Sequence, residues 1–292
     1  MRIVERVLVV GVDGSEHSLQ ALDWAAEEAV RRGTELRIVH GSSWEWYEGH
    51  EPSFGISRGS VRAYADRIVA QAAERARRRT VSAKVTTQVL PEDPAAALIR
   101  MSREAGAVVV GSRGHGELAG LLLGSVGLTV SAHAESPVIV VRGGEKNRTG
   151  GFRTVAVGID EAEGAAPVLE FAFAAAAQRG AAVRAVHAWR CPAHDVADYP
   201  RSADVVEPHR QSAEALLDKT LEQHMQEHRA FTVHREAIEG KPRAVLLDAA
   251  RTADLLVVGA RRRSGHVGMQ LGPVNHAVLH HSACPVALVP HD

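Results

Sequence analysis

The sequence predicts an α/β protein made of two tandem, doubly wound domains, each with a five-stranded parallel sheet. Three observations support this fold class. The chain has 292 residues, which is enough for two domains of ordinary size. Short apolar segments alternate with longer amphipathic ones, an order typical of strands and helices in parallel sheets. Segments of the first half also recur in the second half at a nearly constant offset.

The internal repeat defines the predicted domain organisation. Asp13 and Asp160 each follow an apolar run and lie 147 residues apart, while Gly111 and Gly259 lie 148 residues apart. A Ser-Pro-Val motif near the end of the first half matches a Cys-Pro-Val motif at the same offset of 148. A repeat this long indicates two copies of one domain. We predict domains at residues 1–143 and 152–292, joined by a glycine-rich, charged linker at residues 143–151.

Local patterns predict the elements of the first copy. Short β-branched runs indicate strands, and apolar residues at intervals of three and four indicate the first helix. A proline at the start of a helix, such as Pro94, fits the first helical position. Continuous apolar runs suit strands that are buried on both faces of the sheet. We expect strands at residues 6–13, 35–40, 81–90, 107–111 and 137–142, and helices at residues 16–32, 58–79, 94–104 and 124–134. The second copy follows the same plan.

Composition excludes several classes of function. The net charge is −1 and aromatic residues make up 4%, which gives neither a basic footprint for nucleic acid nor a stacking platform for its bases. The sequence has neither a run of about 18 apolar residues nor a signal peptide, so we expect a cytoplasmic protein with no membrane span. Cys191 and Cys284 form no Cys-x-x-Cys pair, and Cys284 is expected to be a small buried apolar residue.

The candidate site lies after the fourth predicted strand of the first copy. In doubly wound sheets, ligands bind outside the carboxyl ends of the strands, where the strand order reverses. There Gly111, Gly114, Gly124 and Ser125 have the spacing G-x2-G-x9-G-S. Glycines let backbone N–H groups approach a phosphate closely, and the start of the next helix adds further N–H groups and a hydroxyl. A bulkier residue at Gly111 is therefore expected to abolish retention of the phosphate-containing ligand without unfolding the protein.

Other side chains are predicted to complete this site. Arg113 or His115 would add positive charge beside the phosphates. Asp13, at the end of the first strand, would hold a ribose hydroxyl or a metal ion. Residues near Val39 and His40 would flank a base. Each feature alone also has a purely structural explanation as a turn or a helix cap, so the prediction rests on their convergence.

This pattern resembles the universal stress protein family in its tandem-domain form. Gly11, Asp13, Gly14 and Ser15 match its first loop, and the glycine-serine spacing matches its ATP-binding signature. The resemblance implies five-stranded parallel sheets, bound ATP with or without Mg²⁺, frequent homodimers and roles in stress survival. It implies contact of Asp13 with the adenosine part and of the motif with ribose and phosphates. The predicted nucleotide-binding residues are Gly11, Asp13, Gly111, Ser112, Arg113, Gly114, His115, Gly116, Gly124, Ser125 and Val126.

The second copy departs from the motif at two positions. Arg262 stands where Gly114 stood, and its Cβ restricts the close approach of a phosphate. Pro273 replaces Ser125, which removes an N–H group and a hydroxyl but keeps a good first helical residue. Asp160 is retained. We expect a structural domain with a weakened anion site, although arginine side chains could compensate in part.

The favoured function is a nucleotide-dependent regulatory or binding module that acts on an unknown protein partner. A slow ATPase or nucleotidyl-transfer enzyme is the alternative, although no catalytic residue is predicted and the sequence has no P-loop motif. The sequence lacks the motifs that a receiver domain and a Rossmann dehydrogenase require. No metal site is predicted: His224 and His228 are four residues apart but belong to no H-E-x-x-H motif, and we expect surface histidines.

Overall fold

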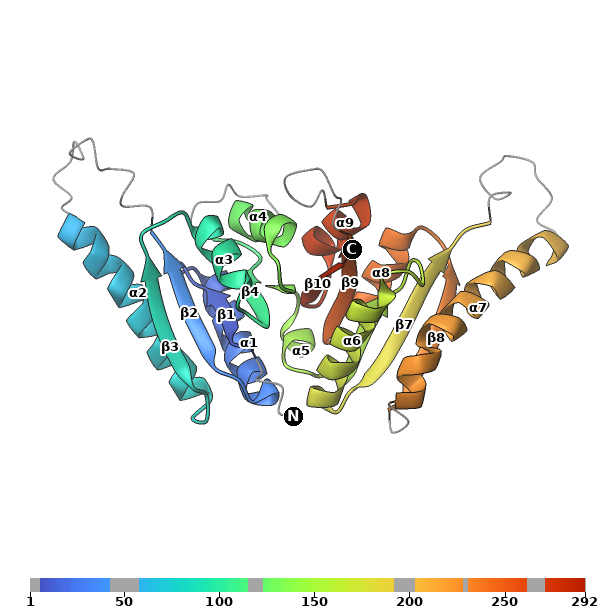
Figure 1. The fold of residues 1–292 in the computed structure, drawn as a ribbon, viewed down its shortest axis with the longest axis horizontal. Helices are drawn as coiled ribbons and strands as arrows, with labels where there is room; N and C mark the ends of the chain where they lie inside the picture. The colour runs from blue at the N-terminus through green and yellow to red at the C-terminus, as the bar shows by residue number, and fades with distance from the viewer. Residues whose placement is uncertain are drawn as a thin grey trace. The chain divides into compact units, whose positions relative to one another are not determined.

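The computed structural model describes residues 6–42, 58–114, 123–191, 203–227, 231–261 and 271–291. The chain divides into two compact units, Met1–Arg142 and Gly143–Asp292 (Figure 1). Each unit is a parallel sheet with helices, which confirms the predicted α/β fold class. No helix among the described residues is both long enough and apolar enough to cross a membrane.

The first unit has the predicted doubly wound topology. Its described strands pair in parallel in the order β3-β2-β1-β4-β5. From β1, the chain turns to one side through β2 and β3 and then to the other side through β4 and β5. Right-handed crossovers in opposite directions put one pair of helices on each face. The strands are β1 (Leu8–Gly11), β2 (Leu36–Gly41), β3 (Val85–Leu90), β4 (Ala107–Gly111) and β5 (Val138–Val141).

The helices of the first unit pack in two pairs, α1 with α2 and α3 with α4. Ser15 caps α1 because its side chain accepts a hydrogen bond from the Ser18 N–H, and Asp93 caps α3 through two such bonds. Gly33 ends α1 in a left-handed conformation. The helices are α1 (Glu16–Arg32), α2 (Arg58–Arg79), α3 (Pro94–Ser102) and α4 (Ser125–His133).

The predicted bounds of α1 and α2 are confirmed, whereas the strand predicted at residues 81–90 is four residues shorter. A turn follows α2, in which the Ala83 N–H donates to the carbonyl oxygen of Thr80 over 3.1 Å. Val81 projects into solvent with 96% of its surface exposed. The strand β3 therefore begins only at Val85, after the chain has completed this turn.

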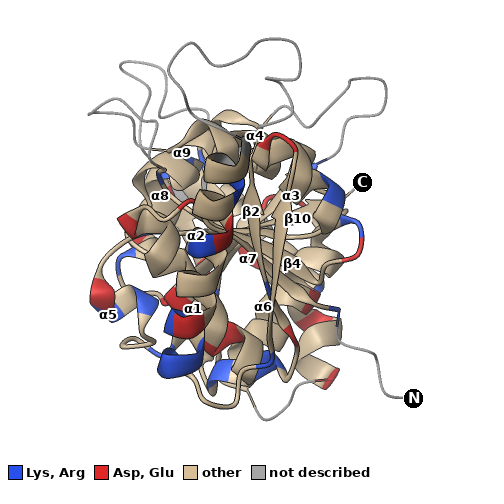
Figure 2. Cartoon of the chain, turned by 90° about the vertical axis from the view of Figure 1, so that its left-hand side faces the viewer, with Lys and Arg blue, Asp and Glu red and all other residues tan. Residues whose placement is uncertain are grey.

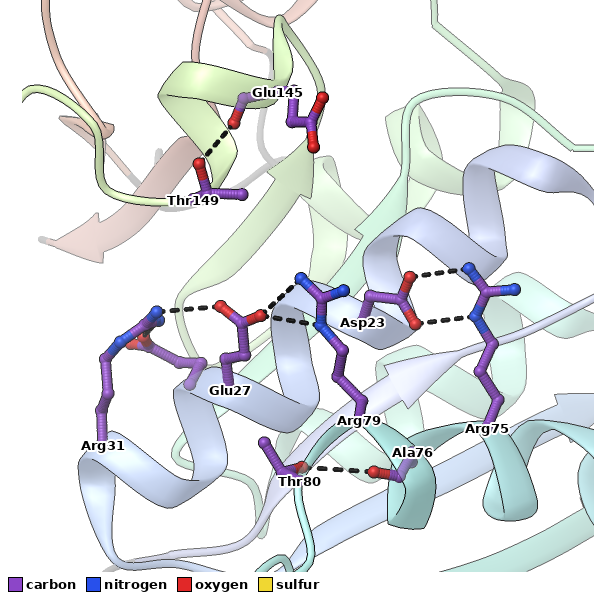
Figure 3. Close-up of polar contacts among 10 residues, drawn as sticks. Asp23, Glu27, Arg31, Arg75, Ala76, Arg79, Thr80, Glu145 and Thr149 are labelled. Carbon is purple, nitrogen blue, oxygen red and sulfur yellow. Dashed lines mark hydrogen bonds and ion pairs between the residues drawn. The ribbon is translucent and has the colours of Figure 1, made fainter.

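Ion pairs join α1 to α2 in the first unit. Arg75 donates to both carboxylate oxygens of Asp23 over 2.7 Å, and Arg79 contacts Glu27 (Figure 3). The hydrogen bond that Arg75 donates to Asp23 raises the pKa of the Arg75 guanidinium. Acidic and basic residues accordingly lie side by side on these helices (Figure 2). These pairs connect the exposed edges of the two helices.

The second unit repeats the same topology. Its described strands pair in parallel in the order β10-β9-β6-β7-β8, so β6 and β9 are the counterparts of β1 and β4. Its strands are β6 (Thr154–Gly158), β7 (Ala182–Trp189), β8 (Val233–Glu239), β9 (Leu255–Arg261) and β10 (Val286–His291). Its longer helices are α6 (Ala165–Arg179), α7 (Ala203–Glu227), α8 (Pro242–Ala250) and α9 (Pro273–His281).

The stretch expected to be a linker is folded into the second unit. It contains the short helix α5 (Glu145–Arg148), in which Asn147 is buried. The Asn147 side-chain amide donates to the carbonyl oxygens of Ala250, Arg251 and Ala253, at 3.3, 3.3 and 2.8 Å. Glycine-rich composition predicted a linker but not this packing, in which one buried amide attaches the segment to the end of α8.

Two side chains of the second unit test the predictions about burial. Cys284 is fully buried, as expected. His224 was expected at the surface, and that prediction is wrong. Only 7% of its surface is exposed, and its ring stacks on Phe173 with 5.5 Å between the ring centroids. The side chain thus lies between α7 and α6. His228, four residues further along the chain, lies outside the described residues.

Candidate functional site

The strand order of each unit creates one point where the chain reverses direction across the sheet. In the first unit this point lies between β1 and β4, which pair in register from Leu8 with Ala107 to Val10 with Val109. Their carboxyl ends, Gly11 and Gly111, therefore lie at the same edge. The predicted site residues follow these two strands, at the place where doubly wound sheets bind ligands.

The loop after β1 holds Asp13 in a defined position. The Ser15 N–H donates to Asp13 Oδ1 over 2.9 Å, and the Asp13 N–H donates to Ser18 Oγ over 3.4 Å. Gly14, between them, has a φ of +87°, which favours glycine. Since Ser15 and Ser18 belong to the start of α1, the helix cap and the carboxylate are positioned together.

The structure brings Asp13 and Gly114 together, although they are a hundred residues apart in sequence. A Cβ placed on Gly114 would lie 2.6 Å from Asp13 Oδ2. The backbone of the loop after β4 can approach the carboxylate this closely because residue 114 has no side chain. The sequence predicted that these two segments converge at the strand ends, but it did not predict this particular contact.

The start of α4 is attached to the same loop. The Gly124 N–H donates to the carbonyl oxygen of Ser112 over 2.9 Å, so this N–H group is already used inside the protein. Gly124 is the N-cap of α4 and has no side-chain capping bond. Ser125 is exposed, and Val126 is half-buried. The first N–H groups of a helix have no acceptor within the helix, so Ser125 and Val126 can donate outward.

Two of the predicted glycines are needed for packing inside the unit. A Cβ on Gly11 would lie 2.7 Å from Leu98 Cδ1 of α3. A Cβ on Gly111 would lie 2.6 Å from the carbonyl oxygen of His17, in the first turn of α1. Because that atom belongs to the backbone, it cannot move aside easily. A bulkier residue at Gly111 is therefore expected to disturb the packing of α1, so this substitution cannot test ligand binding separately from folding.

The remaining predicted residues differ in where the structure places them. Ser112 is buried, and Arg113 is exposed beside the site. His115 and Gly116 lie outside the described residues. The ring of His40, expected beside a base, has its Nδ1 atom 2.7 Å from the carbonyl oxygen of Val12, so it ties the end of β2 to the loop after β1. In the second unit, His187 and Ile159 make the same contact at 2.9 Å.

The corresponding place in the second unit is an open cavity of about 390 Å³ at the ends of β6 and β9. The loop after β6 is longer, so α6 starts at Ala165, five residues after Asp160, whereas α1 starts three residues after Asp13. The ring of His291 occupies the space where a helix turn covers Gly111 in the first unit. Ideal Cβ positions on Gly259 and Gly164 would lie 2.8 and 2.5 Å from its ring nitrogens.

The helix start in the second unit differs as the sequence predicted. Pro273 occupies the first position of α9 after the N-cap Gly272. Asn275 occupies the repeat position of Gly127, and its side-chain amide donates to the carbonyl oxygen of Gly259 over 3.0 Å. Sequence reasoning missed Asn275 and His291, because neither belongs to the glycine motif. Arg262, the substitute for Gly114, lies outside the described residues.

Metal ligands are sparse in the part of the chain that the structure describes. Within it, no three histidine, cysteine, aspartate or glutamate side chains lie close enough together to hold a metal ion.

Comparison with known proteins identifies the family. The sequence model of the universal stress protein family matches twice, at residues 5–142 and 151–290. Universal stress protein Rv1996 of Mycobacterium tuberculosis is 33% identical over 307 residues, which cover 98% of this chain and 96% of the relative. A universal stress protein of Mycolicibacterium smegmatis is 31% identical over 290 residues, which cover 97% of this chain and 96% of the relative.

A solved structure agrees with the fold. The crystal structure of a universal stress protein from Archaeoglobus fulgidus matches with a TM-score of 0.69 and 20% identity, covering 97% of this chain and 98% of that one. Both halves of the sequence match the family model, and both units have the doubly wound topology. The chain belongs to the universal stress protein family, with two of its domains in tandem.

Proposed function

We propose that the first unit binds an adenine nucleotide of the ATP type at the ends of β1 and β4. The observation that carries this proposal is the contact between two loops: residue 114, without a side chain, lies against the Asp13 carboxylate. The start of α4 is joined to the same loop through Ser112 and Gly124. A carboxylate, a bare backbone segment and a helix start thus surround one place on the sheet edge.

Each group suits one part of the nucleotide. Asp13 is held by Ser15 and is suited to accept hydrogen bonds from ribose hydroxyls, or to contact a Mg²⁺ ion carried by the phosphates. The Ser125 and Val126 N–H groups and the Ser125 hydroxyl are suited to phosphate oxygens, which the positive end of the helix dipole also favours. Arg113 is exposed beside them and supplies positive charge.

In this proposal the protein is a nucleotide-dependent binding module of the stress response. Nucleotide that binds one conformation of the first unit more tightly shifts the population toward a state that a protein partner recognises. Homodimer formation remains a prediction from the family resemblance, and a cytoplasmic location remains a prediction from the sequence. Light scattering of the purified chain with and without ATP tests whether it forms a dimer.

The test is the substitution Ser125→Pro, which copies the residue of the second unit. Proline is a good first helical residue, so α4 is expected to form, but the N–H group and the hydroxyl are lost. One charge-assisted hydrogen bond contributes roughly 1.5–3 kcal/mol, so the Kd for ATP is expected to rise about tenfold or more. Isothermal titration of the full chain with ATP measures it.

Two control variants complete this test. Ser125→Ala keeps the N–H group and removes only the hydroxyl, so a smaller loss of affinity is expected. Pro273→Ala makes a change at the same helix position in the second unit and is expected to leave the tight ATP site unchanged. An unaltered ATP affinity in Ser125→Pro, with circular dichroism like that of the unsubstituted protein, would refute the proposed site.

A further inference from the structure

The cavity of the second unit has the size and walls of a small-molecule site. Its volume of about 390 Å³ falls within the roughly 300–1,000 Å³ that is typical of ligand pockets. Apolar side chains from α6, β7, α8 and β9 form much of its lining, including Val168, Leu169, Val186, Leu246 and Val258. Such walls receive a flat, uncharged ring better than a hydrated charged group.

The polar rim of the cavity disfavours a polyphosphate. Asp160, Glu161 and Glu163 line it, against a single guanidinium, that of Arg261, among the described lining residues. That guanidinium is already paired, because Arg261 Nη2 lies 3.0 Å from Glu161 Oε2. A nucleoside triphosphate would bring several negative charges toward three carboxylates. The corresponding loop of the first unit contains Asp13 and Glu16 but has glycine and serine between them.

The groups suited to a phosphate are also replaced in this unit. Pro273 removes the first N–H group and the hydroxyl from the start of α9. The Asn275 amide donates to the Gly259 carbonyl oxygen and so uses one of its N–H groups inside the protein. By contrast, Asp160 is retained at the repeat position of Asp13, the residue suited to ribose hydroxyls. The second unit thus keeps apolar walls and a carboxylate that suit a base and a sugar, and it loses one N–H group and one hydroxyl that suit phosphates.

We propose that this cavity binds an uncharged molecule of the nucleoside class and rejects nucleoside polyphosphates. The assignment of Asp160 to a sugar rests on the proposed function of Asp13, whereas the apolar walls and the acidic rim do not. The two copies would then bind different molecules: the first would bind a nucleotide, and the second would bind the nucleoside without its phosphates.

The experiment uses the full chain and adenosine as the probe. With ATP present at saturation to occupy the first unit, adenosine is titrated by calorimetry. One further molecule of adenosine per chain is expected to bind. Ala188→Phe, which puts a ring into the half-buried end of β7 that lines the cavity, is expected to weaken this binding at least about tenfold. Val274→Phe, from the opposite side on α9, serves as a second variant if the first does not fold.

Charge is tested separately with the double variant Glu161→Gln and Glu163→Gln. Removing two carboxylates and releasing Arg261 is expected to strengthen ATP binding in the second unit at least about fivefold at low salt, with little effect on adenosine. Glu222→Gln with Glu227→Gln is the matched control, because these exposed residues of α7 remove the same charge outside the cavity lining. The control is expected to leave both affinities unchanged.

Three results would overturn the proposal: no adenosine binding beside ATP, adenosine binding that both cavity variants leave unchanged, or wild-type ATP binding of equal affinity at two sites per chain. The proposed function of the first unit fails by a different result, since only that site depends on Ser125. Adenosine binding that is lost in Ala188→Phe and kept in Ser125→Pro therefore supports this inference whatever the outcome for ATP.

Discussion

The two units share one topology, but they differ in what lies over the switch point, the place between β1 and β4 or between β6 and β9 where the chain reverses direction across the sheet. In the first, the opening turn of α1 lies against Gly111, and the Asp13 carboxylate lies against Gly114. In the second, α6 begins later, the His291 ring fills the space beside Gly259, and an open cavity remains. The comparison shows that a repeat can keep its strands and helices while a longer loop and a few side chains change what the site can bind.

The largest expected difference is between the losses of stability in Gly111→Ala and in Gly259→Ala. The new methyl group meets the His17 backbone in the first unit but meets mainly the movable ring of His291 in the second. We expect Gly111→Ala to lower the free energy of unfolding by at least about 2 kcal/mol and Gly259→Ala by about 1 kcal/mol or less. Scanning calorimetry measures both; equal losses would show that α1 does not restrict Gly111.

A smaller effect is expected at the starts of α3 and α8. Asp93 caps α3 by accepting from the Ala95 and Ala96 N–H groups over 2.9 and 3.0 Å. Lys241, at the same place before α8, makes no side-chain capping bond. Asp93→Ala should therefore cost about 1 kcal/mol of stability and Lys241→Ala almost nothing. If urea unfolding shows the two variants to be equally stable, the asymmetry in capping has no energetic consequence.

The ion pair between α1 and α2 should contribute less still. Asp23 and Arg75 are joined by two hydrogen bonds, but 44% of the Arg75 side chain is exposed, so water and salt screen the attraction. A double-mutant cycle with Asp23→Ala and Arg75→Ala is expected to give a coupling of about 0.5 kcal/mol that falls with added salt. A coupling that is independent of salt would contradict this interpretation.

The smallest effect concerns an exposed pair within α7. The hydrogen bond from Arg210, and then that from Gln211, holds the pKa of the Glu207 carboxyl below its ordinary value. Any stability that this pair contributes is present at neutral pH and is lost as the pH falls through the lowered pKa. In Arg210→Ala, an NMR titration should show the Glu207 pKa rising toward its ordinary value. An unchanged pKa would mean that Arg210 does not hold the carboxylate in solution.

Sequence patterns predicted most of the fold because its signals are local. Apolar residues at helical spacing predicted α1, and the repeat offset predicted that the second unit would copy the first. The turn at Thr80 and Ala83 shortened a strand because a polar, exposed segment can satisfy its hydrogen bonds within itself. Asn147 escaped prediction because its partners lie about a hundred residues further along the chain.

The candidate site was predicted only where its residues form a motif. The strand-end rule predicted that the segments of Asp13 and Gly114 would converge, but not that these two residues would be in contact. It also did not predict that Gly111 would be covered by the backbone of His17 or that His291 would fill the matching space. These contacts depend on where each helix starts after its loop, and a difference of two residues in loop length has no signature in the motif itself.

The central claim is that nucleotide binds at the first switch point and is rejected at the second. The most direct measurement is a crystal structure of the full chain grown with excess ATP. The account predicts ATP between Asp13 and the start of α4, and no nucleotide in the cavity beside Asp160 and Pro273. ATP in the cavity of the second unit, or a first unit without nucleotide, would contradict it.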